Sequence, residues 1–174
     1  MKIRYNFQHH FRLVSGLTGF AVFFALLAFV AADNSKGKLV YKGPKKVFNV
    51  DLQFARFVSG PDAFDDKKKI RRLIFTGTNI DSKIKSCDAM NCVDVHIEGL
   101  QVDLDAAPRL LYWVSLNGQL VQYSGTVVNE TLSLTTDSKE RLAGTLKFDQ
   151  SAAGGPTVEV TFDAPLLKTF AKAR

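Results

Sequence analysis

The chain has 174 residues, with three His, two Cys and a formal net charge of +6 at pH 7. Three of its cations lie in the first 32 residues, which hold no acid, so the other 142 residues carry only +3. That charge is too small for a nucleic-acid-binding domain, which concentrates a basic face. The length is that of one domain whose core is large enough to fold without staples.

The N-terminal segment has the order of a secretory signal peptide. Three cations in the first twelve residues precede an apolar run, residues 13–32, which ends in the small residues Val30, Ala31 and Ala32. This order predicts cleavage before Asp33. Twenty apolar residues can also span a bilayer, so a retained membrane tether through residues 13–32 is the alternative. Both interpretations place the rest of the chain outside the cytoplasm, in the periplasm or the medium, because the positive flank stays inside.

After the leader the chain is predicted to be mainly β-strand, because Thr, Val, Phe and Tyr are frequent and apolar residues alternate with polar ones. The clearest alternation puts Phe48, Val50, Leu52 and Phe54 on one face. The expected strands are residues 38–42, 47–57, 70–75, 93–104, 110–116, 119–127, 132–135, 142–149 and 157–163.

The connections between these strands carry turn signals. Asn117-Gly118 between two apolar runs predicts a β-hairpin, because both central residues of its turn take positive φ. Residues 78–88 are expected to be irregular or briefly helical, and residues 165–174 a short helix or a frayed tail. The fold class is therefore mainly β: residues 33–174 as a single antiparallel β-sandwich or a partly closed β-barrel.

The two cysteines, Cys87 and Cys92, are expected to form a disulfide, because an even pair in an exported protein is oxidised. The alternative is a metal or redox pair. Together with His96, however, the two thiols make an incomplete zinc set, and C-x4-C is not the C-x-x-C redox spacing. We therefore expect no cofactor and no bound metal.

One candidate for catalysis is His96 with Asp94 and Glu98, which share a face if residues 93–104 form a strand. A His between two carboxylates can bind a metal or act as a base, as in a small hydrolase. The alternative is the solvated outer face of an antiparallel sheet.

Two regions are candidates for binding. The basic run Lys67, Lys68 and Lys69 can contact phosphate or lipid head groups, or it can be a charged loop that blunts a sheet edge. Near the hairpin tip at Asn117, an exposed Trp113 can anchor a sugar, a peptide or a protein, or it can pack across strands.

Several segments occur together: GKLVYKG at residues 37–43, FVSGPDAFDDKKK at 57–69, LAGTLKFDQ at 142–150 and GGPTVEVTFDAPL at 154–166. With the Asn-Gly hairpin they are similar to a group of small exported bacterial proteins of unknown function. That group has a signal peptide, one β-rich domain, an FD-x-x-K loop and a V-x-F-x-A-P ending. The resemblance implies a bacterial envelope location and a β fold, and it implies no activity.

The sequence therefore predicts a non-enzymatic exported β-domain that binds a small ligand or a protein partner in the bacterial envelope. Two alternatives remain: a hydrolase centred on His96, metal-dependent or not, and a structural envelope component.

Overall fold

The computed structural model describes residues 34–65, 67–106 and 108–174. The predicted leader, residues 1–32, lies outside them, so neither cleavage nor a tether is tested. No helix within the described residues is long and apolar enough to cross a membrane.

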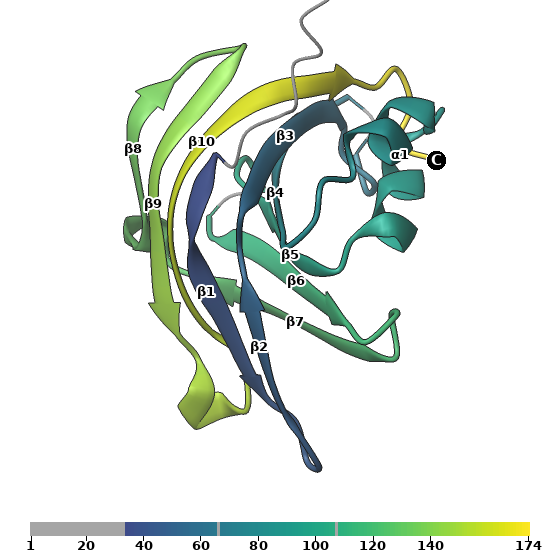
Figure 1. Ribbon diagram of the computed structural model, residues 1–174. Coiled ribbons are helices and arrows are strands. Elements are labelled where there is room, and N and C mark those ends of the chain that lie inside the picture. The colour runs from purple at the N-terminus through teal and green to yellow at the C-terminus, as the bar shows by residue number, and fades with distance from the viewer. Residues whose placement is uncertain (1–33, 66, 107) are drawn as a thin grey trace, which may run out of the picture. The chain divides into compact units, whose positions relative to one another are not determined.

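The described chain contains ten strands and four short helices (Figure 1). The strands are β1 Ser35–Lys42, β2 Val47–Asp51, β3 Phe54–Pro61, β4 Lys69–Thr76, β5 Gly99–Asp103, β6 Leu110–Leu116, β7 Val121–Val127, β8 Leu132–Asp137, β9 Arg141–Asp149 and β10 Thr157–Thr169. The helices are α1 Asp81–Ser86 and three 3-10 helices: η1 Met90–His96, η2 Asn129–Thr131 and η3 Ser151–Ala153.

The strands form one curled, open sheet, so the prediction of a mainly β fold is confirmed. Its order is β2-β1-β10-β3-β4-β5-β6-β7, with β9 also pairing with β10 and β8 with β9. Strand β10 arches through the centre of the sheet in Figure 1. Its first part lies antiparallel between β1 and β9, and its last residues, from Leu166 to Thr169, run parallel to β3. All the other pairs among the described strands are antiparallel.

Asn34 lies where β10 stops pairing with β1 and begins to pair with β3. Its side-chain Nδ2 donates to the carbonyl oxygens of Ala55, at 2.7 Å, and Asp163, at 2.6 Å. Its Oδ1 accepts from the backbone N–H of Ala55 at 2.7 Å. One amide side chain thus satisfies the backbone groups that the fork between three strands would leave unpaired.

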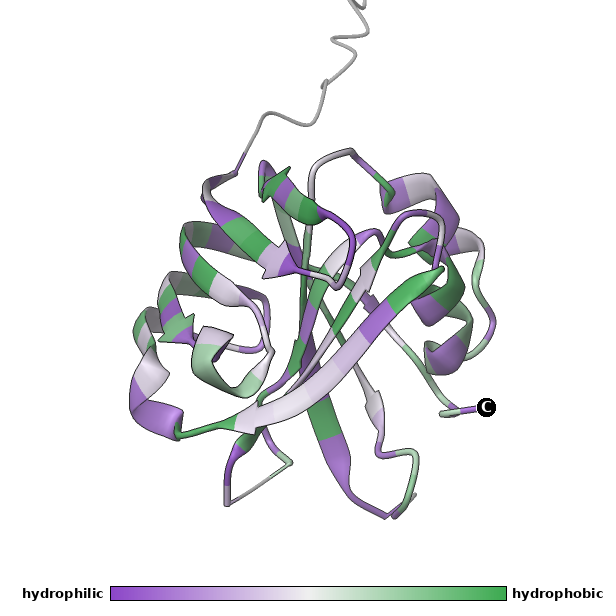
Figure 2. Cartoon of the chain, turned by 90° about the horizontal axis from the view of Figure 1, so that it is seen from below, coloured by the Kyte–Doolittle hydropathy of each residue, from purple (hydrophilic) through white to green (hydrophobic). Residues whose placement is uncertain are grey.

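The concave side of the sheet holds the main core. Hydrophilic and hydrophobic residues alternate along the curled strands in Figure 2, and the inward ones pack together from β1 to β10. Phe75 and Phe162 meet edge to face with ring centroids 5.2 Å apart, which links β4 to β10.

A second apolar layer covers the outer side of β3 and β4. Val58 and Ile74 point outward there and contact buried side chains of α1 and η1, including Ile84 and Val93, together with Phe170. These two strands are therefore buried on both faces, which explains why residues 55–58 and 72–76 are continuously buried.

Three predicted elements are wrong in their bounds. The strand expected over residues 47–57 is two strands, because at Leu52 and Gln53 the chain leaves β1 for β4. Leu52 N–H still donates to Gly37 O, whereas Gln53 N–H donates to Thr76 O. At the C-terminal end, residues expected as a helix or tail instead continue β10 to Thr169.

The strand expected over residues 93–104 is also wrong at its start. Residues up to His96 belong to η1, and only Gly99–Asp103 is strand. Met90, Val93 and Ile97 are buried while Val95 is 66% exposed, so the apolar period is that of a helix. The alternating segment Val-Asp-Val-His fits a strand as well as a helix, and packing against β3 and β4 selects the helix.

Residues 78–88, expected to be irregular or briefly helical, contain the short helix α1, and the Asn-Gly hairpin is confirmed by β6 and β7. The hairpin loop has four residues, because Leu116 pairs with Val121. Asn117, Gly118 and Gln119 all have positive φ, at 56°, 64° and 71°.

Candidate binding groove

A groove of about 460 Å³ lies on the outer side of β4, β5, β6 and β7, beyond the edge of the helical layer. Its floor consists of outward side chains of adjacent strands. Arg72 is opposite Asp103, Gln101 is opposite Trp113, and Trp113 is opposite Ser124. The strand register therefore brings together residues that are up to 52 positions apart in the sequence.

The centre of the floor is a buried ion cluster. The guanidinium of Arg72 binds Asp103 through two bonds, Nε to Oδ1 at 2.6 Å and Nη2 to Oδ2 at 3.0 Å. Its Nη1 donates to Asp94 Oδ1 at 2.9 Å, and its Cζ lies 5.3 Å from the centroid of the Trp113 ring. A bidentate pair together with a bond to a second carboxylate holds the guanidinium in one orientation.

The cluster has one cation for two carboxylates. Burial lowers the pKa of Arg72, but hydrogen bonds and attraction to Asp103 and Asp94 outweigh it, so the net pKa is raised and the guanidinium stays charged. Burial raises the pKa of Asp94; the charge of Arg72 opposes this rise and the charge of Asp103 adds to it. The negative charge in the floor is thus incompletely compensated.

Gln101 is a buried polar residue of this floor whose side-chain oxygen makes no hydrogen bond. It is 4% exposed, and its Oε1 is buried with no hydrogen-bond partner. Because a buried acceptor without a donor costs free energy, such atoms are rare in folded domains. The amide lies between Asp103 on its own strand and Trp113 on β6, where it borders the groove.

One wall of the groove joins the hairpin tip to η1. Gln119 borders the groove, and its Nε2 donates to the carbonyl oxygens of Ile97 and Asp94. The N–H of Asn117 donates to Glu98 Oε1 at 3.0 Å. These bonds hold the hairpin although a glutamine at positive φ is strained.

The rim carries exposed apolar side chains. Phe64 is 89% exposed and Val95 66%, and both line the groove. They are two of the five large apolar side chains exposed in the described part of the chain. Apolar groups gathered around a polar floor are typical of an interaction site.

The structure brings two of the predicted site residues into this groove, Trp113 and Asp94. Lys67, Lys68 and Lys69 follow the loop whose start, Asp62 to Phe64, forms another wall, but they are not among the described residues that line it. Asn117 is likewise outside the lining and acts through its bond to Glu98.

The proposed shared strand face of Asp94, His96 and Glu98 is wrong, because η1 occupies that segment. Asp94 turns to Arg72, and Glu98 accepts from the hairpin backbone. The two carboxylates are therefore engaged on different partners.

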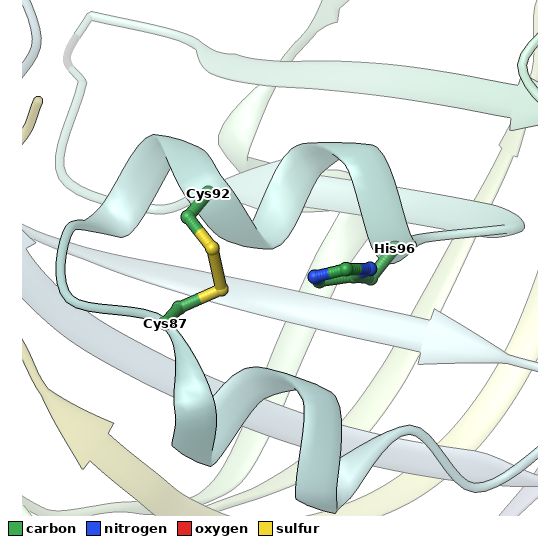
Figure 3. A group of neighbouring side chains, drawn as sticks. All are labelled: Cys87, Cys92 and His96. Carbon is green, nitrogen blue, oxygen red and sulfur yellow. A yellow bond between two sulfur atoms is a disulfide. The ribbon is translucent and has the colours of Figure 1, made fainter.

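His96 instead lies beside the disulfide. Cys87 and Cys92 are bonded, as predicted, with Cα atoms 5.6 Å apart. The imidazole extends toward the two sulfurs, and the three donor groups lie within 4.8 Å of one another (Figure 3). Metals bind thiolate rather than disulfide sulfur, so these residues could hold an ion only after reduction.

Sequence reasoning missed Gln101, Asp103 and Gln119. The available signal was a pair of opposite charges, Arg72 and Asp103, on two neighbouring strands that are rich in apolar residues. Pairing them requires the register of β4 against β5, which the sequence does not contain.

No protein-family model, no curated protein and no solved structure matches this chain. The resemblance to small exported bacterial proteins therefore stays a prediction.

Proposed function

We propose that this protein is an exported, non-enzymatic β-domain that binds a ligand or protein partner in the bacterial envelope through the groove over β4–β7. The observation that carries the proposal is the buried, unpaired Oε1 of Gln101 in the floor of an open groove. This atom is covered but belongs to a residue that borders the groove, and a bound molecule that donates to it would supply the missing hydrogen bond. The apolar rim supports the same proposal, because it would be covered in a complex.

Binding is favoured over the hydrolase alternative by the partners of the carboxylates near His96. Asp94 is bonded to Arg72, and Glu98 to the N–H of Asn117. A catalytic His needs a group that orients it within hydrogen-bond reach, and these two carboxylates serve other contacts.

Export is supported by the leader and by the disulfide, since disulfides persist in oxidising compartments. N-terminal sequencing of the protein recovered outside the cytoplasm tests this part. A start at Asp33 supports a cleaved signal peptide, whereas a start at Met1 supports the tether. Recovery of the protein in the cytoplasm alone would refute export.

The groove is tested by thermal melting against a panel of peptides, amines and sugars. A ligand at a hundred times its Kd should raise the melting temperature by about 5–10 °C. The rise should disappear in Trp113→Ala and persist in Phe48→Ala. Phe48 is a matched control, because it is a part-buried aromatic with its own cation–π contact, 5.2 Å from Lys46 Nζ. An unchanged melting temperature with every probe, or a shift that survives Trp113→Ala, would refute the assignment.

A further inference from the structure

The charge of the groove is opposite to that of the protein around it. Its charged lining residues are three acids, Asp62, Asp94 and Asp103, and one base, Arg72. Residues 33–174 as a whole carry a formal charge of +3. A concave site of one sign inside a domain of the other sign selects its occupant by charge.

The polar atoms of the floor that lack partners are acceptors, so a bound molecule must supply hydrogen-bond donors. Gln101 Oε1 is an acceptor without a donor, and Asp94, whose side chain is 46% exposed, receives one bond from Arg72 while an ionised carboxylate can accept several. Trp113 adds an aromatic ring, which attracts cations and already has the Arg72 guanidinium 5.3 Å from its centroid. Unpaired acceptor, excess carboxylate and indole together fit a group that carries only donors and positive charge.

We propose that the groove binds the lysine or arginine side chain of a peptide segment whose neighbouring residues are apolar. This inference rests on the proposed function and names the chemistry of its partner. The ammonium or guanidinium binds the exposed part of the Asp94 carboxylate, beside the Trp113 ring and the Arg72 guanidinium that already contacts both. Gln101 Oε1 accepts from it once the amide turns toward the groove, and the apolar neighbours cover Phe64 and Val95.

Two observations favour a peptide over a free amine. A small amine bound at the polar floor would leave the exposed side chains of Phe64 and Val95 in water. Among the described strands, β7 pairs with β6 and with no other, so its outer edge offers backbone groups to an extended chain. A peptide can use the floor, the rim and this edge at once.

The test uses Trp113 itself, the single tryptophan of the chain. The purified protein is titrated with the capped pentapeptide Val-Lys-Leu-Lys-Val while its tryptophan emission is followed. A saturable change is expected, and acetylation of both lysine Nε atoms should weaken binding at least about tenfold, because a charge-assisted hydrogen bond is lost.

Variants locate the site. Asp94→Asn should weaken the peptide about tenfold, by loss of one charged contact. Asp51→Asn, an exposed acid on β2 that also pairs with a cation, Lys38, should leave binding unchanged. Gln101→Leu should also weaken binding, because it removes the unpaired acceptor of the floor. Far-ultraviolet dichroism of each variant verifies that it is folded.

Three results would overturn the inference. These are equal affinity of the acetylated peptide, tighter binding of the acidic analogue Val-Glu-Leu-Glu-Val, and spermidine binding as tightly as the lysine peptide. If one of them holds while another probe still stabilises the protein in a Trp113-dependent way, the inference fails and the proposed function stands. If no probe of any class acts through Trp113, both fail.

Discussion

The outer side of the β3–β7 sheet has two halves that differ in what covers them. Over β3 and β4, the short helices and Phe170 bury an apolar surface that includes Ile74. Over β5, β6 and β7, polar side chains and Trp113 line an open groove. One half is covered by the chain's own short helices, whereas the other is open, and the proposed partner would bind there.

Helix η1 forms the boundary between the halves, and its two sides contact different halves. Val93 and Ile97 pack into the apolar layer, whereas Asp94 and Val95 face the groove. The disulfide between Cys87 and Cys92 closes the turn that leads into η1. The following predictions test whether stability and binding divide along this boundary.

The largest expected effect is that of Asp103→Ala, which leaves the buried guanidinium of Arg72 without its bidentate partner. Removing one member of a buried ion pair costs about 3–5 kcal/mol of unfolding free energy. Urea denaturation measures it. Asp163→Ala, which removes the exposed partner of Arg141, should leave the unfolding midpoint unchanged within error. Equal losses in the two variants would contradict a buried cluster.

In the covered half, Ile84→Ala should destabilise the protein by about 3 kcal/mol, because it opens a cavity at a fully buried position. Well below its melting temperature the variant should bind the lysine peptide as the native protein does. Val95→Ala, on the other side of the boundary, should do the reverse: little loss of stability and weaker binding. A loss of affinity in Ile84→Ala at full folding would show that the halves are coupled.

The disulfide should contribute about 2 kcal/mol, the value expected for a loop this short. Replacing both Cys87 and Cys92 by Ala, followed by thermal melting, measures it. Reducing agent should lower the melting temperature of the native protein and should not change that of the double variant. An unchanged native melting curve in reductant would contradict a stabilising role.

The smallest effect on stability is expected for Gln101→Leu. Removing an unpaired buried acceptor should leave the unfolding free energy unchanged or raise it by about 1 kcal/mol. The same variant should lose much of its affinity for the lysine peptide. A loss of stability well above 1 kcal/mol would mean that the amide has a structural role.

Much of the strand content could be predicted from alternation alone, as could the hairpin at Asn117-Gly118 and the bond between Cys87 and Cys92. These features depend on residues close together in the chain, whose spacing and chemistry the sequence contains. The predicted bounds are wrong where one segment fits both the helical and the strand period, or where the chain changes from one pairing strand to another. Val93 to Ile97 fits both a strand and a helix, and burial against the outer side of the sheet selects the helix.

The sequence by itself determined a β-rich domain, one disulfide and a leader with the pattern of an export signal. Only the tertiary structure decided that Arg72, Gln101, Asp103 and Trp113 share one floor, because their proximity comes from the register of β4 to β6. Strand register depends on pairing and packing across the whole sheet, so a floor assembled from three strands leaves no local pattern in the chain.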